Sequence, residues 1–256
     1  MQAMTIEDVL KATGGTLLSG DIHQTFNDVI SDSRKVTAGV LFVPLVGEKF
    51  DGHEFIKAAF DLGASAVLTQ RDTELLVDKT IVKVEDTLKA FGDIAKYYKQ
   101  KYNVPTVSVT GSVGKTTTKD MLASVLSQKY NTLKTMGNFN NEIGLPITIF
   151  GLEKEHEAAV LEMVMNHFGE IEHLADIGRP DVAVITNIGQ SHIENLGSRE
   201  GIFKAKMEMT KLFTKDNTLI VNGDDDYLSK TKGIFRWKIV KTCHSFPKLR
   251  TVLKGR

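Results

Sequence analysis

Residues 105–120 read Pro-Thr-Val-Ser-Val-Thr-Gly-Ser-Val-Gly-Lys-Thr-Thr-Thr-Lys-Asp, and this stretch decides the fold of the chain. The β-branched run over 106–110 predicts a strand, a turn with two glycines follows, and 117–128 predicts a helix. A strand, a glycine-rich loop and a helix N-terminus together form a phosphate cradle, because backbone N–H groups and the helix dipole converge on an anion. The stretch therefore predicts a nucleotide-binding loop.

The residues of this loop are suited to different parts of a bound nucleotide. The two glycines let the backbone turn tightly and approach phosphates closely. Lys115 adds a positive charge, and the hydroxyl of Thr116 is a suitable Mg²⁺ ligand. The common form of the loop has its first glycine where this chain has Val109, so the loop here is a shorter variant. The predicted phosphate-binding residues are Gly111, Ser112, Gly114, Lys115, Thr116 and Thr117.

The composition is that of a soluble globular protein with one large or two ordinary domains. The chain has 256 residues, of which 41% are hydrophobic and 25% are charged. No apolar run approaches the ~20 residues that a membrane-spanning helix needs, and the N-terminus lacks a signal-peptide pattern. The single Cys243 excludes an intramolecular disulfide. We therefore expect a cytoplasmic protein without membrane insertion.

The net charge of zero hides an uneven distribution of charges. Residues 229–256 contain nine Lys and Arg residues and no acidic residue, so all 32 acidic residues lie in 1–228. An acidic body argues against a nucleic-acid partner. The basic tail over 229–256 is atypical, and its composition leaves open an interaction arm, a solvated terminus or a fragment of structure.

The order of predicted elements indicates an α/β protein with two domains. In 1–103, strands are predicted at 40–45 and 66–69 and helices at 53–62 and 87–102, and Pro105 follows the second helix closely. From 104 onward strands and helices alternate, which predicts a mostly parallel sheet with flanking helices. The predicted strands of this second part are 106–110, 158–162, 181–186 and 218–222, and its predicted helices are 117–128, 171–176 and 199–213, with Ser198 as the N-cap of the last.

Polar side chains follow three of these strands directly. They are Glu162, the segment 163–170 and the segment 187–195. Because ligands of parallel sheets bind at the carboxyl ends of the strands, these side chains are expected beside the nucleotide, with Glu162 near Thr116 as a second oxygen ligand of Mg²⁺. Histidine is an unusual Mg²⁺ ligand, so the residue type alone favours a structural role for His192. The asparagines in 137–146 are expected either to bind substrate or to cap local turns.

Several segments together resemble the Mur ligase family, which forms amide bonds with ATP in the synthesis of the bacterial cell wall. The resemblance covers roughly 1–228 and includes the short form of the phosphate loop. The matching segments are 32–36, 39–45, 47–53, 110–116, Asn140-Asn141, 166–171 and 189–206.

The resemblance implies the roles of individual residues. It implies that 1–103 binds the UDP part of a substrate and that 104–256 is a central ATP-binding domain of the P-loop NTPase type. Lys115, His192 and Lys206 are the implied catalytic residues, and Lys206 matches a lysine that is often carbamylated in the family and then binds metal. The implied metal site consists of Thr116, Glu162, His192 and Lys206; Asn140 and Asn141 would contact the nucleotide, and Ser33, Arg34, Asn166 and His167 would contact the substrate.

The resemblance also implies a reaction. ATP and Mg²⁺ would drive the addition of D-alanyl-D-alanine to UDP-N-acetylmuramoyl-tripeptide through an acyl phosphate, in a monomeric enzyme. The family carries a third, C-terminal domain that this sequence lacks, so we expect little or no ligase activity from the chain alone. A folylpolyglutamate synthase-like ligase and a non-catalytic module that binds nucleotide or UDP-substrate are the alternative functions. A signalling GTPase is a third alternative, which the absence of an Asn-Lys-x-Asp base-reading motif disfavours.

Overall fold

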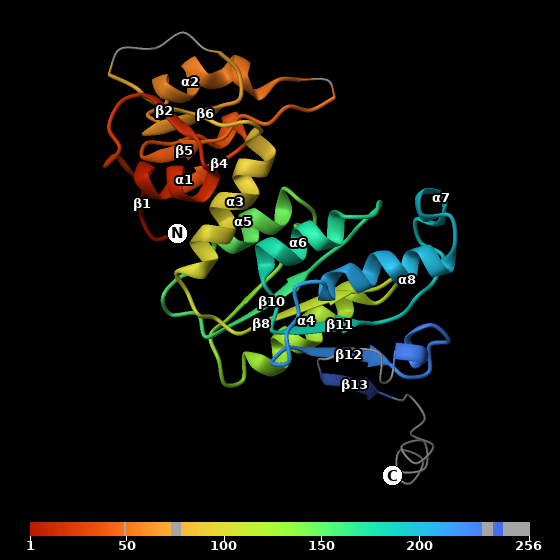
Figure 1. Ribbon diagram of the computed structural model, residues 1–256. Coiled ribbons are helices and arrows are strands. Elements are labelled where there is room, and N and C mark those ends of the chain that lie inside the picture. The colour runs from red at the N-terminus through yellow and green to blue at the C-terminus, as the bar shows by residue number, and fades with distance from the viewer. Residues whose placement is uncertain (49, 73–77, 232–237, 243–256) are drawn as a thin grey trace. The chain divides into compact units, whose positions relative to one another are not determined.

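The computed structural model describes residues 1–48, 50–72, 78–231 and 238–242, and these residues form two compact units (Figure 1). Unit 1 contains Met1–Val104 and Met136–His156, and unit 2 contains Pro105–Thr135 and Glu157–Arg256. The sequence predicts one boundary near residue 104; the structure adds a return of the chain to unit 1 over Met136–His156. Cys243 and the rest of the basic tail beyond Thr242 lie outside the described residues.

Unit 1 is a small α/β unit built on a mixed sheet. The five-stranded sheet has the order β2-β7-β6-β5-β4, in which only the β2–β7 pair is antiparallel, and β1 and β3 form a separate antiparallel pair. Its elements are β1 (Met4–Thr5), α1 (Ile6–Thr13), β2 (Thr16–Ser19), β3 (Thr25–Phe26), β4 (Asp28–Ile30), η1 (Ser33–Lys35), β5 (Val40–Phe42), η2 (Gly52–Phe55), α2 (Ile56–Asp61), β6 (Ala66–Thr69), β7 (Thr80–Lys83), α3 (Thr87–Gln100) and α5 (Gly144–Phe150).

Local sequence signals account for most of these elements. Thr5 and Asp8 form a capping box at the start of α1, and Asp86 caps α3 by accepting a hydrogen bond from the N–H of Lys89. The strand predicted at 66–69 and the helix predicted at 87–102 are confirmed as β6 and α3. The strand predicted at 40–45 is shorter, because β5 ends at Phe42 before Pro44, which has no N–H for a sheet.

The helix α5 differs from the expectation for its segment. The sequence predicts a turn-rich loop over 137–146, whereas a buried helix begins at Gly144. Aromatic packing ties this helix to α3: the ring of Phe150 lies 5.4 Å from that of Phe91 and 6.1 Å from that of Tyr98. The hydroxyl of Tyr98 also donates a 2.6 Å hydrogen bond to the carbonyl of Leu152. These contacts explain why 136–156 belongs to unit 1 although strands of unit 2 flank it in the sequence.

Unit 2 is a parallel sheet with helices on its faces, as predicted. Its six strands have the order β13-β12-β11-β8-β10-β9, and every described pairing in this sheet is parallel. Its elements are β8 (Thr106–Thr110), α4 (Lys115–Leu126), β9 (Thr132–Lys134), β10 (Ala158–Glu162), α6 (Glu170–Gly178), β11 (Val182–Ile185), α7 (Ile193–Leu196), α8 (Arg199–Met207), η3 (Glu208–Thr210), β12 (Thr218–Asn222), η4 (Leu228–Thr231) and β13 (Lys238–Thr242).

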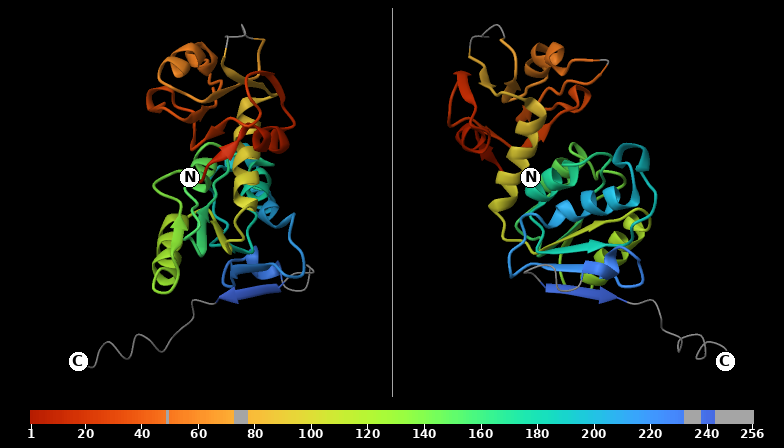
Figure 2. Two further views of the ribbon diagram at one scale, coloured as in Figure 1. Left: turned by 90° about the vertical axis from the view of Figure 1, so that its left-hand side faces the viewer. Right: turned by 45° about the vertical axis from the view of Figure 1, so that its right-hand side comes forward.

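The helices lie on both sides of this sheet. In the left-hand view of Figure 2, α4 lies on one side of the strands and α8 on the other. The face under α4 is apolar: Val109 of β8 and Val160 of β10 are fully buried and form a core cluster with Ala123 of α4. Such burial of large aliphatic side chains contributes about 2 kcal/mol for each residue. Packing against the sheet therefore holds the helix that carries the predicted phosphate loop.

Two strands of unit 2 are absent from the sequence-based prediction. β9 is only three residues long and too short to show a periodicity, and β13 lies within the basic segment 229–256. β13 pairs in parallel with β12 at one edge of the sheet, so a solvated terminus is the wrong description for that part of the tail. The strands predicted at 106–110, 158–162 and 218–222 and the N-cap predicted at Ser198 are confirmed. No helix among the described residues is long and apolar enough to cross a membrane.

Candidate active site

The loops that follow three neighbouring strands meet at one edge of the unit 2 sheet. β8 lies between β10 and β11, and the registers place Val109 opposite Glu162 and Thr110 opposite Ile185. All three strands are parallel, so their carboxyl ends coincide at this edge. The loop after β8 is the glycine-rich loop, and hydrogen bonds link it to the ends of the other two strands. The predicted grouping of these segments is therefore confirmed.

The glycine-rich loop leaves the N-terminus of α4 open. Gly114 occupies the N-cap position with φ of 81°, and no side chain caps the helix there. The N–H groups of the first turn, from Lys115 to Thr117, have no acceptor within the helix. A Cβ at Gly114 would meet no atom within 4 Å, so the protein leaves open space at the start of the helix. Free N–H groups facing open space fit a phosphate.

Asn187, at the end of β11, holds the back of the loop. Its side-chain oxygen accepts hydrogen bonds from the N–H groups of Ser112 at 3.2 Å and Val113 at 3.0 Å, and its amide nitrogen donates to the carbonyl of Val113. The hydroxyl of Ser112 accepts a 2.8 Å bond from the N–H of Gly189. The polar groups of Ser112 thus already serve the scaffold of the loop. This role of Asn187 depends on a contact across 74 residues, for which no local pattern in the sequence carries a signal.

Replacing Asn187 by alanine is expected to loosen the loop. The change removes three hydrogen bonds but leaves only the N–H of Val113 without a partner, because the N–H of Ser112 also donates to the backbone carbonyl of Asn187 and the carbonyl of Val113 also accepts from the hydroxyl of Thr186. One unpaired N–H and two lost bonds together cost about 2 kcal/mol. We expect a free energy of unfolding lower by roughly 2 kcal/mol in a denaturant titration. Asn195→Ala is the matched control, since its side chain makes no hydrogen bond among the described residues. Equal stabilities of the two variants would contradict the role of Asn187.

Two lysine side chains near the loop influence each other electrostatically. The ammonium of Lys115 donates to the carbonyl of Gly111 at 3.0 Å. Lys206, on α8, is only 3% exposed. Burial and, second, the charge of Lys115 lower the pKa of Lys206 to about 8. Among the described residues, neither lysine forms an ion pair with a carboxylate. Two neighbouring cations without a counter-ion form a site for an anion.

The buried Lys206 ammonium predicts a pH-dependent stability. The folded pKa of about 8 lies below the ordinary value of 10.5. Below pH 8, Lys206 is protonated in both the folded and the unfolded chain, and the folded chain carries the full cost of a buried ammonium. Between pH 8 and 10.5 the unfolded chain binds more protons than the folded chain, so the free energy of unfolding rises with pH. We expect Lys206→Met to raise the free energy of unfolding by about 2 kcal/mol at pH 7. In denaturant titrations, the stability gain of Lys206→Met should be smaller at pH 10 than at pH 7. An equal gain at both pH values would contradict a buried ammonium at Lys206.

Thr116 and Glu162 lie together, as predicted. Glu162 is 2% exposed, and its Oε1 accepts a 3.3 Å hydrogen bond from the hydroxyl of Thr116. Two hard oxygen donors beside a phosphate cradle suit Mg²⁺, which takes its remaining ligands from water and phosphate. The described residues contain no group of three or more His, Cys, Asp and Glu side chains that could hold a metal by themselves. The donor set therefore fits a cation that arrives with a nucleotide.

The other predicted residues of unit 2 lie in the loops around this site. His192 precedes α7 with φ of 64°, a conformation that is uncommon outside glycine. Asn166 and His167 are exposed, and both bind Glu170: the N–H of Asn166 donates at 2.6 Å and the ring of His167 at 2.8 Å. Although partial burial alone would raise the pKa of Glu170, these bonds lower it. Any contact of these residues with substrate remains a prediction.

The predicted residues of unit 1 lie in two places. Ser33 and Arg34 line an apolar cavity of about 630 Å³, whose other walls include Phe42, Phe50 and Phe55. The guanidinium of Arg34 is 87% exposed and makes two 2.8 Å hydrogen bonds to the carboxylate of Asp32, which lower the pKa of that carboxyl to about 2. A cavity of this size with a few polar groups at its rim suits a small-molecule ligand.

Asn140 and Asn141 lie in the segment of unit 1 that precedes α5. The side-chain oxygen of Asn141 accepts a 2.8 Å hydrogen bond from the N–H of Gly144. This bond is the local capping that the sequence left open as an alternative to ligand binding. The predicted contact of these two asparagines with a nucleotide remains a prediction.

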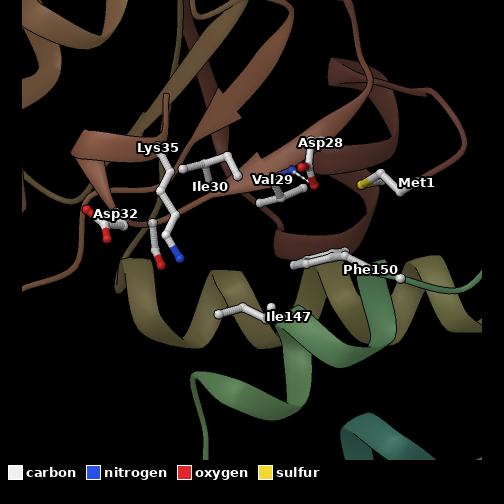
Figure 3. Close-up of a pocket in the computed structure, with 10 residues that line it drawn as sticks. Met1, Asp28, Val29, Ile30, Asp32, Lys35, Ile147 and Phe150 are labelled. Carbon is white, nitrogen blue, oxygen red and sulfur yellow. Dashed lines mark hydrogen bonds between the residues drawn. The ribbon is translucent and has the colours of Figure 1, made fainter. Parts of the chain in front are cut away.

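A second, smaller cavity of unit 1 measures about 270 Å³ (Figure 3). Ile147 and Phe150 of α5 form one wall, and Asp28, Val29 and Ile30 of β4 form the opposite wall. Lys35 extends toward it from the end of η1. None of the site residues predicted from the sequence lines this cavity.

Sequence comparisons identify both units. The pattern of the Mur ligase middle domain matches residues 109–248, more than half of the chain, and that of the Mur ligase family catalytic domain matches residues 26–99. The UDP-N-acetylmuramoyl-tripeptide–D-alanyl-D-alanine ligase of Bacillus subtilis is 45% identical over 226 residues, which are 88% of this chain and 50% of that protein. The ligase of the same name from Escherichia coli is 40% identical over 88% of this chain and 49% of its own length.

Structural comparisons agree with this assignment. A crystal structure of MurF from Acinetobacter baumannii superposes with a TM-score of 0.88 at 34% identity, covering 94% of this chain and 53% of that one. MurF ligase from Thermotoga maritima, in complex with ADP, superposes with a TM-score of 0.79 at 36% identity, covering 85% and 50%. The chain thus spans about half the length of the relatives that it matches. On its sequence and on the geometry of its phosphate loop, the chain belongs to the Mur ligase family.

Proposed function

We propose that this chain provides the UDP-substrate-binding and ATP-binding units for the addition of D-alanyl-D-alanine to UDP-N-acetylmuramoyl-tripeptide in peptidoglycan synthesis. One observation carries the proposal: the open N-terminus of α4 and the ammonium of Lys115 form a phosphate cradle directly beside the Thr116–Glu162 pair, which can supply oxygen ligands to a divalent cation. Relatives up to 45% identical bear the name of this ligase, which supports the choice of substrates.

The reaction needs an activated carboxyl group. A carboxylate is a poor electrophile, because its leaving group would be oxide. The terminal carboxylate of the tripeptide therefore attacks the γ-phosphorus of ATP, and ADP leaves. The amine of D-alanyl-D-alanine then attacks the acyl carbon, a C–N bond forms, the C–O bond to phosphate breaks, and the amine loses a proton. Lys115 neutralises the transferring phosphoryl group and holds it in line with the attacking oxygen.

The metal would be held by residues at the same edge. Thr116 and Glu162 provide oxygen ligands, with His192 and Lys206 as the further proposed members of the metal site. When bound, Mg²⁺ supplies charge neutralisation for the phosphates. An ammonium at Lys206 would repel the cation, so its role requires carbamylation: the neutral amine attacks CO₂, an N–C bond forms and a proton leaves. The lowered pKa of Lys206 favours this neutral form.

The UDP part of the substrate is assigned to unit 1. The proposed site is the apolar cavity at Ser33 and Arg34, where aromatic and aliphatic walls suit a nucleobase and the exposed guanidinium suits a diphosphate. Asn166 and His167 are proposed to contact the peptide part, and Asn140 and Asn141 the nucleotide. The proposal includes a monomeric state and a cytoplasmic location; light scattering of the purified chain tests the first.

Binding measurements with the chain as it exists test the proposal. In titration calorimetry we expect ADP to bind more tightly with Mg²⁺ than with EDTA, ADP to bind more tightly than GDP, and UDP-N-acetylmuramic acid to bind independently of ADP. Arg34→Ala should weaken only the UDP ligand, because Arg34 lies in unit 1. Absence of binding of both ADP and the UDP ligand would refute the proposal.

Two alternatives give different results in these assays. A folylpolyglutamate synthase-like ligase would bind ADP but not the UDP ligand. A non-catalytic binding module would bind both ligands and yet form no acyl phosphate from ATP and the UDP-tripeptide. Trapping of the acyl phosphate with hydroxylamine, in a protein that also carries the remaining length of the relatives, separates this module from the ligase.

A further inference from the structure

Lys119 is a buried lysine that the proposed reaction does not use. It lies on α4, one turn after Thr116, and its side chain is only 3% exposed. Apart from Ala123, it is the only residue of α4 classed as buried. Burying an ammonium costs several kcal/mol unless hydrogen bonds and opposite charges compensate. The groups that contact the Lys119 ammonium therefore indicate its role in the fold.

The ammonium of Lys119 binds the residue that connects two strands. It donates a 2.8 Å hydrogen bond to the carbonyl of Thr135, which directly follows β9 and is fully buried. The second contact of the ammonium is Asp120 at 3.4 Å, a half-exposed carboxylate that also pairs with Lys134 at 2.9 Å. The contact with Thr135 is thus the shorter one and lies entirely inside the unit.

Thr135 in turn forms a hydrogen bond with the backbone of Glu162. Its N–H donates a 3.0 Å hydrogen bond to the carbonyl of Val160, and its hydroxyl accepts a 3.0 Å bond from the N–H of Glu162. The backbone of Glu162 is therefore held by Thr135, while its carboxylate is held by Thr116. Because Thr116 and Lys119 lie one turn apart on α4, the four residues close a ring of hydrogen bonds between this helix and the end of β10.

We propose that Lys119 is a positioning residue for the cation site: through Thr135 it fixes Glu162 relative to Thr116, and so fixes the separation of the two oxygen ligands. The inference rests on the proposed function, in which these two residues hold the divalent cation. Residues that orient metal ligands without touching the metal typically change metal affinity by about 10- to 100-fold. Loss of Lys119 should therefore weaken the cation far more than the nucleotide.

The test compares cation and nucleotide binding in the same variants. Lys119→Met keeps the aliphatic stem and removes the donor. Lys134→Met makes the same change at the lysine that shares Asp120, whereas the hydrogen bond to the carbonyl of Thr135 comes from Lys119. ADP is titrated in EDTA, and Mg²⁺ is then titrated at fixed ADP. We expect Lys119→Met to raise the half-saturating Mg²⁺ concentration about 10-fold while changing the Kd for ADP in EDTA less than about two-fold. Lys134→Met should change neither.

A second pair of variants tests the same inference if the Lys119→Met variant folds poorly. Thr135→Val removes the hydroxyl that accepts from Glu162, and Thr135→Ser retains it; only the valine variant should raise the half-saturating Mg²⁺ concentration. Equal weakening of ADP with and without Mg²⁺ would reduce Lys119 to a structural residue and overturn the inference, as would equal effects of Lys119→Met and Lys134→Met. If the unchanged chain binds ADP without any Mg²⁺ dependence, the cation site of the proposed function is wrong, and this inference is wrong with it.

Discussion

Replacing Lys115 by alanine is expected to lower the affinity of the chain for ADP by roughly 100-fold, because a preorganised charged donor at a phosphate contributes about 3 kcal/mol. Within the part of the chain that the structure describes, the ammonium of Lys115 donates hydrogen bonds only to the carbonyls of Gly111 and Ser112, so its loss removes few polar interactions of the folded protein. It also removes the charge that repels Lys206. Stability should therefore stay the same or rise while binding is lost.

Titration calorimetry with ADP and Mg²⁺ measures the affinity, and thermal unfolding measures the stability. Lys204→Ala is the matched control, because Lys204 lies on α8 two residues before Lys206 and its ammonium forms an ion pair with the exposed Glu200. Its affinity for ADP should equal that of the unchanged chain. An unchanged affinity in Lys115→Ala would remove the phosphate site from this loop, and equal losses in both variants would point to general electrostatics instead.

Replacing Gly111 by alanine is expected to destabilise unit 2 strongly and to abolish ADP binding. The backbone there has φ of 150°, and a Cβ would lie 1.8 Å from the hydroxyl oxygen of Thr186. That hydroxyl donates a 2.7 Å hydrogen bond to the carbonyl of Val113, so it cannot move away without opening the loop. Steric overlap in a packed site costs about 1–3 kcal/mol, and loss of the bond adds to it.

Gly114→Ala is the matched comparison within the same loop. Its φ is 81°, but a Cβ would meet nothing within 4 Å, so only the backbone conformation opposes the change, at about 1–2 kcal/mol. We expect the midpoint of thermal unfolding to fall by roughly 10 °C for Gly111→Ala and by less than half as much for Gly114→Ala. The reverse order of the two midpoints would show that the loop has a different conformation.

The stretch 105–120 predicts its own structure because every signal in it is local. The β-branched run, the glycines and the Lys-Thr pair lie within a few residues of one another, and β8, the loop and α4 follow in that order. The alternation of strands and helices beyond residue 104 likewise predicts a parallel sheet, and the order of such a sheet brings Glu162 to Thr116. These features depend on periodicity and on steric limits of the backbone, which short segments carry.

The other features of the fold and of the site depend on contacts between residues that are distant in the sequence, and short segments do not predict such contacts. α5 joins unit 1 because Phe150 packs on Phe91 and Tyr98, although the flanking strands belong to unit 2. Lys206 acquires its lowered pKa from burial and from a lysine 91 positions away. Lys119 stands four residues before the buried Ala123, a spacing that hints at a buried position, yet only the folded chain supplies Thr135 as its partner. Local sequence signals are thus sufficient for the phosphate loop and the parallel sheet. Which charges are buried, and which groups hold them, follows from the folded chain, because desolvation depends on neighbours that are distant in the sequence.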